Sequence, residues 1–126
     1  THFDHVGKQA RLEAAKQLWQ LAETLQQERK LPLVLMGDLN VRPEDEPLVF
    51  LNSVMDHARN LCAQPYGNPD TWNAFRFKEK PNGQIDHIFL HRAFPATVLK
   101  YTTITDSYDL KYPSDHLPVL AHLQFK

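Results

Sequence analysis

A short, continuous apolar run at residues 33–36 (Leu-Val-Leu-Met) constrains the fold more than any other feature of the sequence. A run of this kind is typical of a strand that is buried on both faces, since a half-exposed strand alternates apolar and polar residues. The run leads directly into residues 37–40 (Gly-Asp-Leu-Asn), so polar side chains are expected where the strand ends. The sequence therefore predicts a sheet that is covered by other layers.

Apolar periodicity predicts the elements around this strand. A helix is expected over residues 8–29, because its apolar residues recur on one helical stripe and Pro32 follows. The stripe consists of Ala14, Ala15, Leu18, Leu21, Ala22 and Leu25. A short helix is expected over residues 47–53, and strands are expected over residues 85–91, 98–105 and 117–125, with polar loops over residues 64–70 and 106–114.

Composition and charge exclude several classes of protein. Hydrophobic residues make up 42% of the chain and charged residues 23%, which argues against a disordered protein. The formal net charge of -1 provides no general basic field that would attract nucleic acid. A single cysteine, Cys62, excludes an internal disulfide. No segment is apolar over the length that a membrane requires, and nothing in the sequence indicates a localisation.

Four polar clusters interrupt the apolar pattern, at residues 2–5, 37–40, 85–87 and 114–116. One aspartate in such a place often does no more than cap a turn or a helix. Asp86, however, lies between Ile85 and an apolar run, and a buried carboxylate is costly unless it is paired or bound to a metal. A histidine N–H is a suitable partner. The four clusters together favour a functional site.

The residue types in these clusters suit phosphoester hydrolysis. Carboxylates and carboxamides without a cysteine ligand favour a hard ion such as Mg²⁺ or Mn²⁺. Histidine provides a proton donor or acceptor near neutral pH. Hydrolysis of a phosphoester uses both a cation, which neutralises developing charge, and a base, which prepares water.

The same segments, in the same order, resemble the motifs of the endonuclease/exonuclease/phosphatase (DNase I-like) superfamily. They are residues 1–2 (Thr-His), 37–40 (Gly-Asp-Leu-Asn), 85–89 (Ile-Asp-His-Ile-Phe) and 114–119 (Ser-Asp-His-Leu-Pro-Val). Members include DNase I-like nucleases, abasic-site endonucleases, inositol-polyphosphate phosphatases and sphingomyelinases. The resemblance implies an α/β (α+β) fold with a mostly antiparallel sheet flanked by helices, corresponding to half of a four-layer α/β/β/α sandwich.

The resemblance also implies a role for individual residues. His2 would hydrogen-bond the scissile phosphate or protonate the leaving group, and Asp38 would orient or deprotonate the attacking water. Asn40 would hold a phosphate oxygen. Asp115 would bind Mg²⁺ or Mn²⁺, directly or through water, and Asp38 is a second, weaker candidate for a metal ligand.

Two further roles concern the end of the chain. His116 would contact the phosphate, and Asp86 would fix the orientation of its ring. Trp72 is a candidate for the rim of the substrate site, although packing in the interior would explain this residue equally well. Three other residues resemble a signature of one branch of the family and are expected around the site: Asp4, His5 and Arg11.

One departure from the family pattern affects the domain assignment. In the family, the amino-terminal half supplies an asparagine and a metal-ligating glutamate, and neither has a counterpart in this sequence. We therefore expect residues 1–126 to be the carboxyl-terminal part of a single domain, with the amino-terminal half absent and required for activity. An apolar face without that half would favour self-association. The substrate would be a phosphoester, either a small molecule or a nucleic acid.

Two alternatives remain open. The chain could bind a ligand or a partner without catalysing a reaction, since the family's glutamate is missing. It could also be a metallo-β-lactamase-like zinc hydrolase, because residues 2–5 (His-Phe-Asp-His) match the end of the His-x-His-x-Asp-His motif. The second alternative lacks the later Gly-His-x-x-Gly-His segment of that family.

Overall fold

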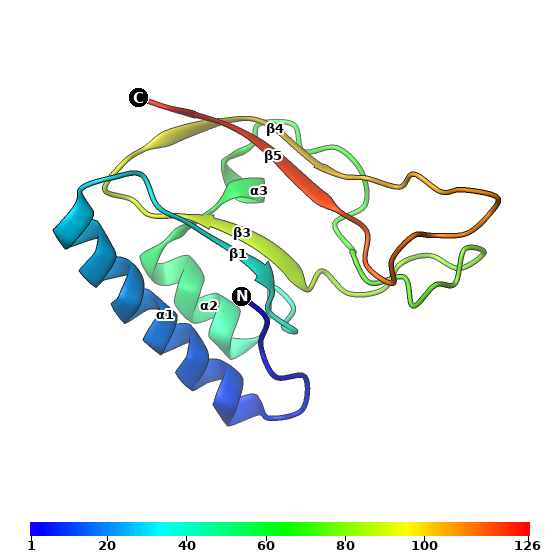
Figure 1. Ribbon diagram of the computed structural model, residues 1–126, viewed down its shortest axis with the longest axis horizontal. Coiled ribbons are helices and arrows are strands. Elements are labelled where there is room, and N and C mark those ends of the chain that lie inside the picture. Colours follow the sequence, from blue (N-terminus) through cyan, green and yellow to red (C-terminus); the bar gives the residue numbers. More distant parts are fainter.

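Two of the helices form one layer of the structure and two sheets form the next two, as described by a computed structural model of residues 1–126 (Figure 1). The elements in chain order are α1 (Lys8–Arg29), β1 (Val34–Asp38), α2 (Glu46–Val54), β2 (Asp56–His57), α3 (Ala58–Leu61), β3 (Asp86–Leu90), β4 (Ala96–Thr103) and β5 (Val119–Phe125). None of the helices is both long and apolar enough to cross a bilayer.

The first sheet has the strand order β1-β3-β2, and both of its strand pairs are antiparallel. The pairing of β1 with β3 places Asp38 directly opposite Asp86. Residues 1–3 extend along the free edge of β1 in the parallel direction, and the Phe3 amide donates to the Asp38 carbonyl over 2.9 Å. The second sheet is the antiparallel pair β4-β5.

Two separate hydrophobic cores lie on the two faces of the first sheet. On one face, α1 and α2 pack around Phe89 and Leu39, which are fully buried. On the other face, Ile88 and Leu90 pack against β4 through Val98 and Tyr101. Figure 1 shows this arrangement, with α1 and α2 on one side of β1 and β3, and β4 and β5 on the other. Strand β3 is therefore buried from both sides, and it carries Asp86 at its first position.

Most of the predicted elements are confirmed, including the helix over residues 8–29 and the mixed fold of helices and antiparallel sheet. Lys30 ends α1 in a left-handed conformation (φ 52°), and Pro47 lies in the first turn of α2, where a missing N–H leaves no hydrogen bond unmade. The buried stripe of α1 differs from the prediction. Leu21 and Leu25 are exposed, whereas Gln26 is buried.

The prediction that β1 is buried on both faces is wrong. Val34 and Met36 are 38% and 61% exposed. They lie on the face of β1 away from α1 and α2, and the core between the sheets reaches β3 but does not extend over β1. The polar residues at the end of this strand nevertheless lie where the sequence predicted.

Candidate active site

The four polar clusters of the sequence meet at one end of the two sheets. Asp38 ends β1 and Asp86 begins β3, and these two residues are direct neighbours across the sheet. His2 lies beside Asp38 in the adjacent extended segment, and His116 lies just before β5. Segments that are more than a hundred residues apart in the chain thus lie together, as the sequence predicted.

Asp38 is the centre of this arrangement. Its Oδ2 atom lies 3.3 Å from Nε2 of His2 and 3.6 Å from Nε2 of His116. Its Oδ1 atom accepts a hydrogen bond from the amide of Asn40 over 2.9 Å. Asn40 adopts a left-handed conformation (φ 49°), and its side-chain amide donates to the carbonyl of Phe3 over 2.8 Å. Asn40 therefore ties the Asp38 turn to the segment that carries His2.

His116 and Asp86 form the predicted hydrogen-bonded pair. Nδ1 of His116 lies 2.8 Å from Oδ2 of Asp86, and the same oxygen accepts a hydrogen bond from the hydroxyl of the buried residue Thr71. Partial burial lowers the pKa of His116, but the hydrogen bond to Asp86 and the charges of Asp86, Asp38 and Asp115 outweigh this effect and raise the pKa above its ordinary value. The cationic form of this ring is thereby favoured.

Gly37 permits the close approach of the segment that carries His2. This glycine has a φ of 151°, and a Cβ atom there would lie 1.8 Å from the carbonyl oxygen of Thr1, far inside van der Waals contact. Only a residue without a side chain fits between the two segments. The glycine of the Gly-Asp-Leu-Asn motif is thus a condition for the contact between His2 and Asp38.

The predicted branch signature builds the turn that follows His2. The carboxylate of Asp4 accepts a hydrogen bond from the amide of Gly7 over 2.6 Å, and the guanidinium of Arg11 donates to the Asp4 carbonyl over 3.2 Å. The backbone amides of Gly7 and Val6 lower the pKa of Asp4. His5 is exposed and lies 4.0 Å from Asp4. These contacts hold the connection between His2 and α1.

The loop over residues 71–83 forms one wall of the site. The amide of Asn73 donates to the carbonyl of Asp115 over 2.8 Å, and its side chain donates to the carbonyl of Ser114 over 3.1 Å. Trp72 pairs with His116 in an isolated bridge and is 39% exposed, so part of its ring reaches the surface beside the site. Thr71 and Asn73 hold the site together, and sequence reasoning missed both. The one sequence signal for them was that they flank Trp72 in the Asp-Thr-Trp-Asn segment.

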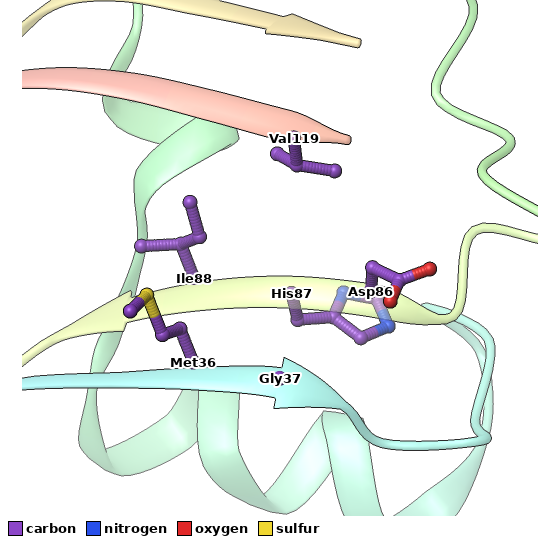
Figure 2. A pocket seen from close by; sticks show the side chains of 6 residues that line it. All are labelled: Met36, Gly37, Asp86, His87, Ile88 and Val119. Atoms are coloured by element: carbon purple, nitrogen blue, oxygen red, sulfur yellow. The ribbon is translucent and has the colours of Figure 1, made fainter. Parts of the chain in front are cut away.

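A cleft borders the site between the two sheets. It is lined from β1, β3 and β5 by Met36, Gly37, Asp86, His87, Ile88 and Val119. In Figure 2, Ile88 points toward Val119 across this cleft, and Asp86 lies at its end. The cleft therefore leads from an apolar floor to the carboxylates.

Asp38, Asp86 and His116 are the residues whose ligand atoms could surround a metal ion, since these atoms lie within 4.8 Å of one another. Asp115, the predicted metal ligand, is not part of this group. Its backbone carbonyl accepts the hydrogen bonds from the loop, while its carboxylate makes no hydrogen bond or ion pair within the chain. The structure thus brings together His2, Asp38, Asn40, Asp86 and His116, with Asp115 next in sequence to His116.

The chain belongs to the endonuclease/exonuclease/phosphatase family, whose sequence model matches residues 1–116. This result confirms the predicted resemblance and leaves no basis for the metallo-β-lactamase-like alternative. No curated protein matches the chain at a significant level.

Solved structures with the same fold agree with this assignment. A mannosyl-6-phosphatase from Bacteroides thetaiotaomicron VPI-5482 is 32% identical, with a TM-score of 0.87 over 98% of this chain and 49% of that one. A family protein from Bacteroides vulgatus is 28% identical, with a TM-score of 0.84 over 99% of this chain and 48% of that one. The human Nocturnin catalytic domain, with bound sulfate, shares the fold at 24% identity, with a TM-score of 0.72 over 99% of this chain and 45% of that one. The chain spans about half the length of these proteins.

Proposed function

We propose that this chain supplies the catalytic acid–base residues of a divalent-metal-dependent phosphoester hydrolase. The observation that carries the proposal is the arrangement of one carboxylate, Asp38, between two imidazoles, with a second carboxylate, Asp86, fixing one of the rings. A carboxylate beside cationic donors can accept a proton from water while the donors bind the anionic phosphate.

The proposed reaction divides these tasks between the residues. The water oxygen forms a bond to phosphorus as Asp38 accepts the water proton, and the bond between phosphorus and the ester oxygen breaks. His2, with a side chain that is 73% exposed, donates a proton to the departing oxygen. His116 in its cationic form binds a phosphate oxygen, while Asn40 holds the Asp38 turn against the segment of His2. Asp86 keeps Nε2 of His116 directed toward the reacting groups.

The donor set of the site fits a hard divalent cation such as Mg²⁺ or Mn²⁺. We propose that Asp38, a partly exposed member of the possible ligand group, holds the ion, and that Asp115, which the family resemblance implies as a ligand, contacts it directly or through water. His116 suits this role less well, because a metal-bound imidazole must be neutral and its raised pKa favours the cation. When bound, the ion would neutralise the charge that develops on the phosphate.

We propose a small phosphomonoester, such as a sugar phosphate, as the substrate. A mannosyl-6-phosphatase has the same fold at 32% identity, and the net charge of -1 provides no basic field for a nucleic acid. Trp72, which is partly exposed beside His116, would contact the organic part of the substrate. A nucleic-acid substrate is the alternative that an assay must test.

We further propose that activity requires polypeptide beyond residues 1–126. The possible ligand group contains no glutamate, although the family resemblance implies one, and the relatives are about twice as long as this chain. Mg²⁺ is usually held by one or two carboxylates, so the loss of one ligand removes much of its binding energy. The exposed face of β1 is where additional polypeptide, or a second copy of this chain, would bind.

The test is hydrolysis of p-nitrophenyl phosphate, mannose 6-phosphate, bis-p-nitrophenyl phosphate and single-stranded DNA, with Mg²⁺ or Mn²⁺ or with a chelator. The protein should be extended to the length of the relatives, and residues 1–126 alone serve as a comparison that we expect to show little turnover. His116→Ala and Asp38→Asn should each lower kcat by about 10²–10⁴-fold without loss of folded structure. His122→Ala, in β5 away from the site, is the matched control.

Each outcome of this assay discriminates between hypotheses. Turnover that disappears with the chelator and in both variants supports the proposal. Normal turnover in either variant at saturating Mg²⁺ contradicts the role given to that residue. A folded, extended protein that hydrolyses none of the probes supports the alternative of a binding protein without catalytic activity.

A further inference from the structure

Two histidines are buried beneath the site, on the face of the first sheet that the reacting residues do not use. His57 in β2 is 5% exposed and His87 in β3 is 1% exposed. His87 directly follows Asp86 in β3, and successive side chains of a strand point to opposite faces, so its ring lies on the other face of the strand from the Asp86 carboxylate, although His87 also borders the cleft. Nε2 of His57 lies 3.0 Å from Nδ1 of His87.

The neighbouring backbone groups fix the direction of the hydrogen bonds. The amide of Arg59 donates to Nδ1 of His57 over 3.2 Å, so the proton of this ring is on Nε2. Nε2 of His57 then donates to Nδ1 of His87, and the proton of His87 is on Nε2. That nitrogen lies 2.8 Å from the carbonyl oxygen of Val41, to which it donates. One chain of hydrogen bonds thus connects Arg59, His57, His87 and Val41, with both rings neutral.

Burial supports the neutral form of both rings. Burial, with smaller contributions from His87 and Arg59, lowers the pKa of His57 to about 3. Burial also lowers the pKa of His87, although the carbonyl of Val41 and the charge of Asp86 act in the opposite direction. A neutral imidazole with one donor and one acceptor satisfies both neighbours without placing a charge in the core.

This chain of hydrogen bonds meets the segments that carry the reacting residues at two points, Val41 and His87. Val41 is buried and immediately follows Asn40, which binds Asp38 and the segment of His2. Without His87, the Val41 carbonyl would be buried without a partner, which is costly enough to move the backbone. On the other side, His87 shares a peptide bond with Asp86, which orients His116.

We propose that His57 and His87 are positioning residues that hold the Asp38–Asn40 turn in register with Asp86. The proposal rests on the proposed hydrolase function for its effect on catalysis, but the hydrogen-bond chain can be tested without any substrate. Neither ring makes a hydrogen bond or ion pair with His2, Asp38 or His116. Their effect is therefore expected on kcat, through the geometry of Asp38 and His116, rather than on KM.

The chemistry of asparagine and glutamine provides a matched pair of variants at position 57. In His57→Asn, the side-chain oxygen keeps the hydrogen bond to the Arg59 amide but cannot reach His87. In His57→Gln, the side chain reaches His87 but loses the bond to Arg59. We expect kcat for p-nitrophenyl phosphate to fall about tenfold in His57→Asn and to stay within about twofold in His57→Gln. KM should stay within about twofold in both variants. The reason is that a misplacement of a reacting group by ~1 Å can lower the rate ~10²-fold.

A purely structural role gives the opposite order. If only the cap of α3 matters, His57→Gln will be the more impaired variant and kcat of His57→Asn will be normal, which would overturn the proposal. At position 87, His87→Gln keeps a donor for the Val41 carbonyl and should retain more kcat than His87→Leu. Thermal unfolding of each variant identifies any that fails to fold. If a variant at position 87 does not fold, the comparison of His57→Asn with His57→Gln decides between the positioning role and the purely structural role.

Long-range ¹H–¹⁵N NMR spectra of the histidine rings test the chain directly. We expect both rings to be neutral at pH 7, each with its proton on Nε2 and exchanging slowly with water. A proton on Nδ1 of His87, or a cationic ring, would overturn the proposal. If the unmodified extended protein hydrolyses no phosphoester, the proposed function fails, and these spectra still decide whether the hydrogen-bond chain exists.

Discussion

Asp86 shows how one side chain can connect a buried strand to reactive groups. Its carboxylate accepts hydrogen bonds from Thr71 and His116, so the cost of its partial burial is offset by two donors. Strand β3, which carries it, is covered on both faces. His116 lies outside the strands, and its ring is oriented mainly by the hydrogen bond to Asp86, with Asp38 farther away at 3.6 Å. Removing this carboxylate would therefore free the histidine ring rather than unfold the sheet.

The buried residue His57 should make the protein sensitive to acid. Its folded-state pKa of about 3 lies below the ordinary value of 6.5, so between these values the unfolded chain binds more protons and stability falls as the pH falls. The expected slope from this one group is up to about 1.4 kcal/mol per pH unit. Urea unfolding at pH values from 4.5 to 7.5 should show a shallower pH dependence for His57→Gln than for the unmodified protein. Equal slopes in the two proteins would show that His57 is not neutral and buried.

Gly37 should be irreplaceable for a steric reason. In Gly37→Ala, the new Cβ would overlap the carbonyl of Thr1, so the segment of His2 must move away from Asp38. Gly83→Ala is the matched control, since Gly83 also has a positive φ (102°), but a Cβ there would meet no atom closer than 3.6 Å. We expect the backbone strain common to both to cost about 1–2 kcal/mol, and in the extended protein only Gly37→Ala to lose most of the proposed phosphoesterase activity. Similar activities in the two variants would contradict the close packing at Gly37.

The residues that sequence could identify differ physically from those that it could not. Asp86 could be predicted because a carboxylate between Ile85 and Ile88 requires a partner, whatever the fold. The pair His57 and His87 could not, because its members are thirty positions apart and each histidine alone resembles a surface residue. The contact of His2 with Asp38 was implied only by the family resemblance, since a segment of three residues has no periodicity.

At the scale of elements, β2 and α3 are stabilised by their contacts with β3 rather than by the preferences of their own residues. Strand β2 has two residues and pairs with Phe89 and Leu90, and α3 is a single turn that packs against β3 and β4. Neither is long enough to show an apolar repeat, so the sequence predicted neither. Helix α1, with 22 residues, shows its repeat clearly, and its predicted bounds are confirmed. Length decides which elements can be recognised before the structure is known.

Arg92 should stabilise the end of α2 mainly through carbonyl groups. Its guanidinium donates to the carbonyls of Asn52, Ser53 and Met55 over 2.9–3.1 Å, where the last carbonyls of a helix lack partners, and also to Asp56. We expect Arg92→Ala to lower the free energy of unfolding by about 1–3 kcal/mol, measured with urea.

The ion pair with Asp56 should account for little of this effect, because both of its side chains are more than one-third exposed. Asp56→Asn should therefore cost no more than about 1 kcal/mol. Arg92→Lys should be intermediate, because an ammonium group cannot reach all of these acceptors at once. A loss in Asp56→Asn as large as that in Arg92→Ala would assign the effect to the ion pair instead.

At the scale of the whole molecule, the two faces of the first sheet are covered unequally. The face toward α1 and α2 is continuous, whereas the opposite face is covered over β3 and left open over β1 (Figure 1). The open part adjoins the cleft that leads to Asp86 (Figure 2). Any polypeptide that covers β1 would therefore also border the site.

Residues 1–126 alone should self-associate through this face. Val34 and Met36 are exposed apolar side chains next to the apolar floor of the cleft, and contiguous apolar surface of this kind favours association. Sedimentation velocity over a range of concentrations should show dimers or larger species, and Met36→Lys should shift the distribution toward monomer, because a desolvated ammonium group in the contact is costly. Leu110→Lys is the control, since Leu110 is 70% exposed in the loop between β4 and β5, outside this face. A concentration-independent monomer would contradict the prediction. An equal shift in the two variants would place the contact elsewhere on the molecule.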